Sequence, residues 1–138
     1  MMVSLPPDYR PLEQEAFMNP LQVEYFRQKL MRWRMDLIRE ADGTLASLSE
    51  GGILEADITD RASVETDRAL ELRTRDRARK LVSKIDRALG RIEDGSYGWC
   101  DETGEPIGLR RLEARPIATM TVEAQERHER KERVHRDD

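Results

Sequence analysis

The chain has 138 residues and a net charge of −4, and hydrophobic and charged residues each make up 38 % of it, with aromatic residues at 5 %. So few aromatic and apolar side chains exclude a large globular core and favour long, charged helices that share a narrow apolar seam. The negative net charge provides no overall basic field, so nucleic acid is not the default partner. One cysteine excludes an intramolecular disulfide. Since no apolar run reaches signal-peptide or membrane-span length, we expect a cytoplasmic protein with no membrane contact.

A long helix is predicted from Pro20 to about Glu50. Residues 1–20 contain four of the six prolines, which predicts an irregular N-terminal arm. Asn19 is a suitable cap for a helix whose first residue is Pro20. Gly51-Gly52 ends the pattern. The apolar positions step by four and three, as in a coiled-coil heptad, at Phe26, Leu30, Trp33, Leu37, Ala41, Thr44 and Leu48.

A second helix is predicted to begin between Asp57 and Asp60 and to run to about Asp94, where Gly95 ends it. Its predicted seam comprises Ala62, Ala69, Leu72, Ala78, Val82, Ile85, Leu89 and Ile92. Because the connector is short and contains glycine, we expect an antiparallel two-helix hairpin over residues 21–94, with its tip near residues 51–62.

The stretch RTRDRARKL, residues 73–81, is almost wholly polar and carries five basic residues against one acid. One interpretation is a solvated face whose long side chains lie along the coil. The other is a docking surface for an acidic partner. The sequence leaves both open.

Residues 95–138 are predicted to form a small module followed by a charged helix from Val122 to about His135. The segment YGWCDETG begins like a zinc knuckle, but Thr103 stands where a C-x-x-C motif needs its second cysteine. No second cysteine exists, so we predict no structural zinc, and Cys100 is expected to be a small half-buried residue rather than a reactive thiol. The predicted apolar set that holds the module is Trp99, Ile107, Leu109, Leu112, Ile117, Met120 and Val122.

Several long runs of the sequence resemble the DksA/TraR zinc-finger family across roughly residues 16–130. They are FMNPLQVEYFRQKLMRWRMDL, DITDRAS, LELRTRDRARKLVSKIDRALGRIEDGSYGWC and IGLRRLEARP. The resemblance implies an all-α fold, in which a long antiparallel coiled coil projects from a small globular head with a zinc-finger module and a C-terminal helix. The four family cysteines fall at Cys100, Thr103, Thr121 and Ala124. The finger is therefore degenerate here, and the family's zinc is not carried over.

The resemblance also implies a function. Members of the family bind bacterial RNA polymerase, and their coil enters the secondary channel formed with the beta-prime subunit. Together with guanosine tetraphosphate they modulate initiation at ribosomal RNA and amino-acid promoters in the stringent response. They have no catalytic activity and do not bind DNA directly. A hairpin that closes on itself is expected to be a monomer.

The tip of the hairpin carries the first group of candidate functional residues. The family's D-x-x-D-x-A arrangement falls on Asp57, Asp60 and Ala62, which the resemblance makes the acting carboxylates and a small residue required for close approach. From the residues alone, Asp57 is a helix cap and Asp60 a first-turn acid favoured by the helix dipole. One side chain can serve in both ways.

The second group of candidate residues would bind the effector. By the resemblance, the guanosine tetraphosphate site includes Leu81, Lys84 and Arg115, and a further family lysine falls at Gln125, which carries no charge. Arginine suits phosphate because its planar fork donates two hydrogen bonds. From the residues alone, Lys84 is an ordinary exposed lysine, and Arg115 forms a salt bridge with Glu113 or Glu93.

Three other functions remain open at this point. A Gre-like cleavage factor would use the same channel and hold magnesium at an acidic tip. A coiled-coil adaptor without a polymerase role would show an apolar seam that continues through residues 73–81. A nucleic-acid binder would draw on the excess of lysine and arginine in residues 61–92, but this stretch has no interleaved aromatic residues.

Overall fold

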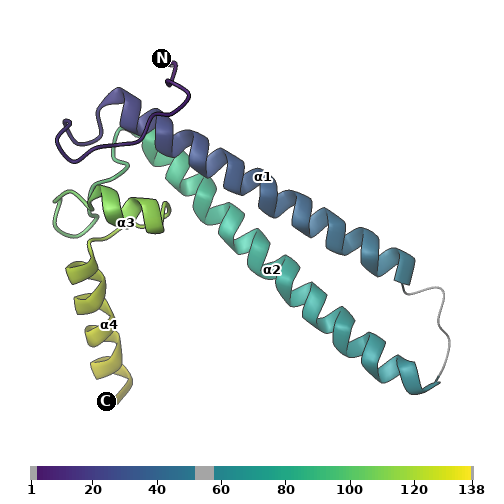
Figure 1. Ribbon diagram of the computed structural model, residues 1–138. Coiled ribbons are helices and arrows are strands. Elements are labelled where there is room, and N and C mark those ends of the chain that lie inside the picture. Colours follow the sequence, from purple (N-terminus) through teal and green to yellow (C-terminus); the bar gives the residue numbers. More distant parts are fainter. Residues whose placement is uncertain (1–2, 52–57, 138) are drawn as a thin grey trace. The chain divides into compact units, whose positions relative to one another are not determined.

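The computed structural model describes the backbone of residues 3–51 and 58–137, and the side chains of residues 3–43 and 63–135. It contains four helices, α1 (Pro20–Gly51), α2 (Ile58–Asp94), α3 (Leu109–Ala114) and α4 (Val122–Asp137) (Figure 1). In the described residues, the β-structure is limited to one isolated antiparallel bridge between Trp99 and Pro106. The all-α prediction is therefore confirmed. No helix in this part of the chain has an apolar stretch long enough to cross a membrane.

The helix boundaries follow the local signals in the sequence. The Asn19 side-chain oxygen accepts hydrogen bonds from the backbone N–H groups of Leu21 and Gln22, at 3.0 and 3.1 Å, which confirms the predicted cap of α1. Helix α2 ends at Asp94, and Gly95 follows it with a φ of 85°, a left-handed conformation that glycine adopts without strain.

The chain divides into two compact units, and each is described by itself. Unit 1 comprises residues 1–30 and 87–138, and unit 2 comprises residues 31–86. In unit 2, α1 and α2 lie side by side and run in opposite directions (Figure 1). Leu37 of α1 and Ala78 and Ile85 of α2 are buried. An ion pair between Arg34 and Asp86, 2.7 Å apart, links the two helices.

The predicted seam of α2 is wrong at its first described positions. Ala69 is exposed, and Leu72 is 50 % exposed. The half-buried positions are instead Val64, Glu71 and Arg75. Stepping back from Ala78 by three, then four and then seven residues reaches Arg75, Glu71 and Val64, so the heptad phase is continuous, and charged residues occupy it at two of these positions. The hydrophobic character of Leu72 favours the wrong phase, because the true seam position beside it is Glu71, a charged residue.

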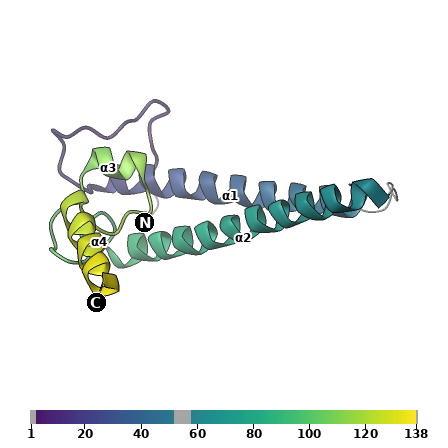
Figure 2. The ribbon, with the colours of Figure 1, turned by 90° about the horizontal axis from the view of Figure 1, so that it is seen from below.

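Unit 1 holds the larger core. Phe26 and Leu30 of α1, Ala88 of α2 and Leu112 of α3 are fully buried, and Tyr97 is 2 % exposed. Figure 2 shows α3 close to the first turns of α1. The Tyr97 ring packs 5.9 Å from that of Phe26, and its hydroxyl donates to the backbone carbonyl of Pro116 at 2.8 Å. Burial raises the pKa of Tyr97 far above its ordinary value, so this hydroxyl stays a hydrogen-bond donor.

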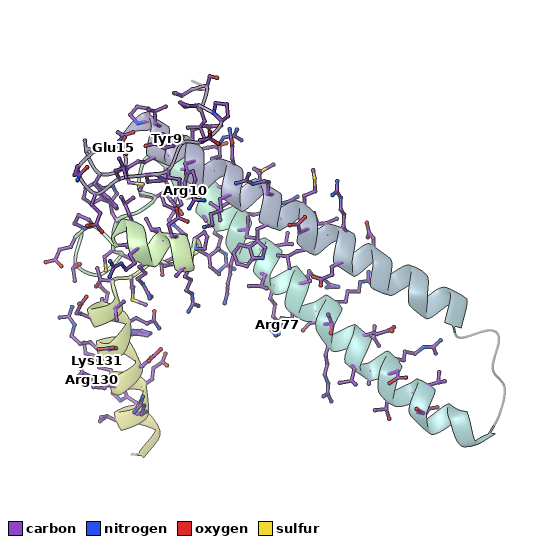
Figure 3. The ribbon with its side chains drawn as sticks, viewed as in Figure 1. Tyr9, Arg10, Glu15, Arg77, Arg130 and Lys131 are labelled. Atoms are coloured by element: carbon purple, nitrogen blue, oxygen red, sulfur yellow. The ribbon has the colours of Figure 1, made fainter. Side chains whose placement is uncertain are left out.

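The N-terminal arm is irregular, as predicted, and specific contacts hold it on unit 1. The Tyr9 hydroxyl contacts both carboxylate oxygens of Glu15, at 3.2 and 3.1 Å, and Figure 3 shows these two side chains together. Buried Gln22 binds the backbone of the arm at two points, through its oxygen and its nitrogen. Phe17 packs edge-to-face on Trp99, with ring centroids 5.3 Å apart.

The corrected seam predicts unequal costs for two leucine truncations in unit 2. Leu37→Ala removes a side chain that is 8 % exposed and should lower the free energy of unfolding by about 2–5 kcal/mol. Leu72→Ala, at a position that is 50 % exposed, should change it by less than about 0.5 kcal/mol. Urea unfolding followed by circular dichroism measures both. Equal losses of unfolding free energy in the two variants would indicate that Leu72 is a seam residue.

Candidate functional site

The predicted tip residues lie at or beyond the start of α2. Asp57 lies outside the described residues, so its role as a helix cap stays a prediction. Asp60 and Ala62 belong to the first turns of α2, which begins at Ile58, and their side chains lie outside the described part. A carboxylate in the first turn of a helix is favoured by the helix dipole. The backbone therefore agrees with the local interpretation of Asp60.

Two of the predicted effector residues lie on α2 in unit 2. Leu81 is half-buried and Lys84 is exposed, and their spacing of three residues makes them neighbours on the helix surface. Arg77 lies seven residues before Lys84, on nearly the same side of the helix. Figure 3 shows the Arg77 side chain extending away from α1. Lys84 therefore belongs to a basic side of α2 that does not face α1.

Arg115, the third predicted effector residue, lies in unit 1 directly after α3. It is exposed, and its backbone N–H donates to the carbonyl of Arg111 at 2.7 Å. The alternative of a salt bridge to Glu113 is wrong, because the structure pairs Glu113 with Lys29. Burial raises the pKa of Glu113, but hydrogen bonds from Lys29 and Tyr25 and the nearby charges of Lys29 and Arg10 together outweigh burial, so the pKa is lowered overall. Arg115 has no ion pair within the described residues and is available to an anion.

Gln125, which falls at a family lysine position, also lies in unit 1. It is half-buried on α4, and its side-chain nitrogen donates to Glu129 at 3.2 Å. Because an amide carries no charge, this position adds no electrostatic attraction for a phosphate.

The degenerate knuckle is a tight loop around Cys100. The backbone N–H of Cys100 donates to the carbonyl of Glu105 at 2.8 Å, and the N–H of Gly104 donates back to the carbonyl of Cys100 at 2.9 Å. Gly104 has a φ of 71°, which allows this turn. The loop thus keeps a knuckle-like form, with Cys100 buried at 4 % exposure. The expectation that Cys100 is only half-buried is wrong, because Thr121, the residue before α4, packs against its sulfur.

The positions of the family cysteines come together around this loop. The backbone N–H of Thr121 donates to Cys100 Sγ at 3.4 Å, and the Thr121 hydroxyl lies 4.0 Å from the same sulfur. Thr121 Oγ1 accepts the backbone N–H of Ala124 at 3.2 Å and so caps α4. Thr103 is exposed, and its hydroxyl accepts the N–H of Glu105 at 3.2 Å.

These residues do not fit zinc. A structural zinc site takes four thiolate, imidazole or carboxylate ligands, whereas these positions supply one thiol, two hydroxyls and one methyl group. No cluster of three or more histidine, cysteine, aspartate or glutamate residues suited to a metal occurs among the described residues. His128, on α4, pairs with Glu132 instead.

Hydrogen bonds hold the Cys100 sulfur in the loop. Burial raises the pKa of the Cys100 thiol, but hydrogen bonds from Thr103, from the backbone of Thr121 and from the backbone of Glu102 lower it, to about 7 overall. The sulfur therefore serves as an acceptor that joins the loop to the start of α4.

The aromatic residue that supports the knuckle was not the one predicted. Trp99 is 38 % exposed and Val122 is 45 % exposed, whereas Tyr97 is buried. Trp99 packs on Phe17 of the arm, a contact that the local sequence does not reveal. The remaining predicted positions are buried at Ile107, Leu109, Leu112 and Ile117 and half-buried at Met120.

Two family models match the chain. The model described as "DnaK suppressor protein DksA, N-terminal domain" matches residues 22–92. The model described as "Prokaryotic dksA/traR C4-type zinc finger" matches residues 95–130. The second match covers the degenerate knuckle, although the chain retains one cysteine.

Curated proteins and a solved structure resemble the chain over most of its length. The RNA polymerase-binding transcription factor DksA of Caulobacter vibrioides is 69 % identical over 131 residues, covering 95 % of this chain and 92 % of the relative. The same factor from Escherichia coli K12 is 42 % identical over 109 residues, covering 79 % and 72 %. The structure of transcription factor DksA2 from Pseudomonas aeruginosa superposes with a TM-score of 0.79 at 45 % identity, covering 87 % of this chain and 94 % of that one.

The lowered pKa of Cys100 predicts a pH dependence of stability. Because the folded pKa, about 7, lies below the ordinary value of 9.0, the thiolate stabilises the folded state fully above pH 9. This contribution falls between pH 9 and pH 7 and is absent below pH 7. The wild-type protein should therefore gain about 2 kcal/mol relative to Cys100→Ala from pH 7 to pH 9, measured by urea unfolding. Parallel curves for the two proteins would contradict it.

Proposed function

This chain belongs to the DksA/TraR zinc-finger family, and from this premise we propose that it is an RNA polymerase-binding transcription factor. The observation that carries the proposal is its similarity, over nearly the whole chain, to curated RNA polymerase-binding factors. The helical fold and the high TM-score to another transcription factor of the family support it.

The proposed mechanism uses the hairpin as a probe of the polymerase secondary channel. Helix α2 has 37 residues and is about 55 Å long at 1.5 Å per residue, so it is long enough to reach into a deep channel. Asp57 and Asp60 would bring negative charge close to the active centre, and Ala62 would permit close approach. The start of α2 at Ile58, which makes Asp60 a first-turn residue, supports this assignment.

The proposed effector is guanosine tetraphosphate, bound between this protein and the polymerase by Leu81, Lys84 and Arg115. The exposure of Lys84 and the absence of an ion pair on Arg115 within the described residues support the proposal, since both cations are available to phosphate. Uncharged Gln125 weakens the site relative to one with a lysine there.

We also propose that the protein acts without zinc and without catalysis. The hydrogen bonds on Cys100 Sγ and the cap that Thr121 forms on α4 support a metal-free knuckle. In this proposal the protein is a cytoplasmic monomer that regulates initiation through the polymerase, with no DNA contact of its own and no transcript cleavage.

Transcription in vitro from a ribosomal RNA promoter tests the function. The protein, after exhaustive chelation, should inhibit this promoter, and guanosine tetraphosphate should increase the inhibition. Asp60→Asn should abolish inhibition while polymerase affinity changes less than about twofold, because it removes a charge and keeps the side-chain shape. Asp67→Asn, at an exposed position further along α2, is the matched control and should behave as wild type.

Three results would count against this proposal. Loss of inhibition after chelation would show that the protein requires a metal. Parallel loss of binding and inhibition in Asp60→Asn would make Asp60 a binding residue. Cleavage of backtracked RNA by the wild-type protein would favour the Gre-like function instead.

Binding of labelled guanosine tetraphosphate to the polymerase complex tests the effector residues. Arg115→Ala and Lys84→Ala should each weaken nucleotide affinity by about tenfold, the loss of a charge-assisted hydrogen bond. Arg130→Ala, on the exposed part of α4 labelled in Figure 3, is the control and should leave affinity unchanged. Unchanged affinity in Arg115→Ala would remove Arg115 from the site.

A further inference from the structure

Unit 2 contains a groove between α1 and α2 that the proposed function does not use. Its volume is about 210 Å³. Its apolar lining includes Leu37, Ile38 and Ala41 of α1 and Ala78 and Val82 of α2. All of these residues belong to one compact unit, so the groove is a property of the hairpin itself.

Exposed apolar side chains extend the groove along α1. Met31, Met35 and Ile38 are 41, 53 and 37 % exposed. Their spacing of four and three residues places them on one side of the helix, and Ile38 is also part of the groove lining. On α2, Leu72 is 50 % exposed and lies one turn before Arg75, another lining residue. Exposed apolar side chains beside an apolar groove favour an interaction site, and methionine adapts to varied partners.

The charge of the groove is mainly positive. Arg75 and Arg79 line it, against one lining acid, Asp42. Neither arginine has an ion pair within the described residues, whereas neighbouring Lys80 is paired with Asp76. An apolar floor beside two guanidinium groups that have no ion pair in the described part of the chain suits a ligand with apolar residues on one face and carboxylates beside them.

This surface is distinct from the proposed effector side of α2. Arg75 and Lys84 are nine residues apart, which at 100° per residue places them on opposite sides of the helix. Arg77, two residues from Arg75, extends away from α1 in Figure 3. The basic stretch 73–81 therefore has two faces, and the groove accounts for one of them.

We propose that the groove binds an amphipathic helix with acidic flanks from a partner protein, which completes a three-helix bundle with α1 and α2. The segment from Met31 to Asp42 is 12 residues long, about 18 Å, and so offers room for about three turns of a docked helix. Apolar anchors at intervals of four and three residues would fill the groove, and carboxylates would pair with Arg75 and Arg79. The inference does not depend on the proposed polymerase function.

A second copy of this chain is a poorer occupant. Self-association through this face would bring a second set of the same arginines to the interface, where like charges are costly. An acidic helix neutralises them instead. The short groove also predicts a small, reversible interface rather than an obligate one.

Fluorescence anisotropy with the full-length protein tests the proposal. The probe is a labelled synthetic helix of about 14 residues with leucines at intervals of four and three and glutamates on both flanks. A matched peptide has lysine in place of every glutamate. The acidic peptide should bind with Kd below about 100 µM, and the basic peptide at least tenfold more weakly.

Variants of the protein locate the binding site. Met35→Glu should weaken binding of the acidic peptide at least tenfold, and Arg79→Glu should reverse the preference between the two peptides. Leu70→Glu is the matched control, since Leu70 is 52 % exposed and lies on another side of α2, and it should bind as wild type. Because all three positions are exposed, the variants should keep the wild-type circular dichroism spectrum.

Four outcomes would overturn the proposal. Equal binding of the two peptides, or no binding of the acidic peptide, would each contradict it. So would a loss of peptide affinity in Leu70→Glu equal to that in Met35→Glu. The fourth is a concentration-dependent dimer, seen in sedimentation experiments, that Met35→Glu abolishes. The last result would assign the face to self-association. Loss of polymerase binding in Met35→Glu without any peptide binding would assign it to the polymerase. Failure of the proposed function alone leaves the peptide result unaffected.

Discussion

The packing of α1 against α2 along one narrow seam is the constraint on which the hairpin depends. Leu37, Ala78 and Ile85 supply its buried apolar part in unit 2. Further along α2, Arg75 and Glu71 continue the same heptad phase with charged side chains. A seam so short of apolar side chains leaves a groove beside it. The composition that limits the core of this protein therefore also creates an open groove with an apolar floor.

The degenerate knuckle shows how a metal-binding frame is held by weaker interactions. One sulfur remains, and it accepts a backbone hydrogen bond from Thr121, whose hydroxyl caps α4. Tyr97 adds a buried ring and a hydrogen bond to the carbonyl of Pro116. Individually each of these contacts contributes about 1 kcal/mol. Together with the buried leucines of α3 they join the loop, α3 and the start of α4 without zinc ligands.

The helices and their limits were predictable because their signals are local. Asn19-Pro20 begins α1, Gly95 follows the end of α2, and the apolar periodicity between them identifies the helices. From Ala78 onward the predicted positions are buried or half-buried, but the prediction omits Ala88, which is fully buried, and wrongly includes Leu72. Hydrophobicity alone predicts that Leu72 is buried. The heptad positions that face α1 are instead Glu71 and Arg75, although their side chains are charged.

The sequence by itself determined the all-α fold, the family and the loss of three cysteine ligands, because residue type and spacing carry this information directly. The tertiary structure alone decided that Glu113 pairs with Lys29 rather than Arg115, and that Tyr97 rather than Trp99 is buried. It also decided that Ile38 lines an open groove and that Met31 and Met35 are exposed on the same side of α1. These outcomes depend on contacts between residues far apart in the chain, and no local pattern specifies which distant side chain will occupy a given space.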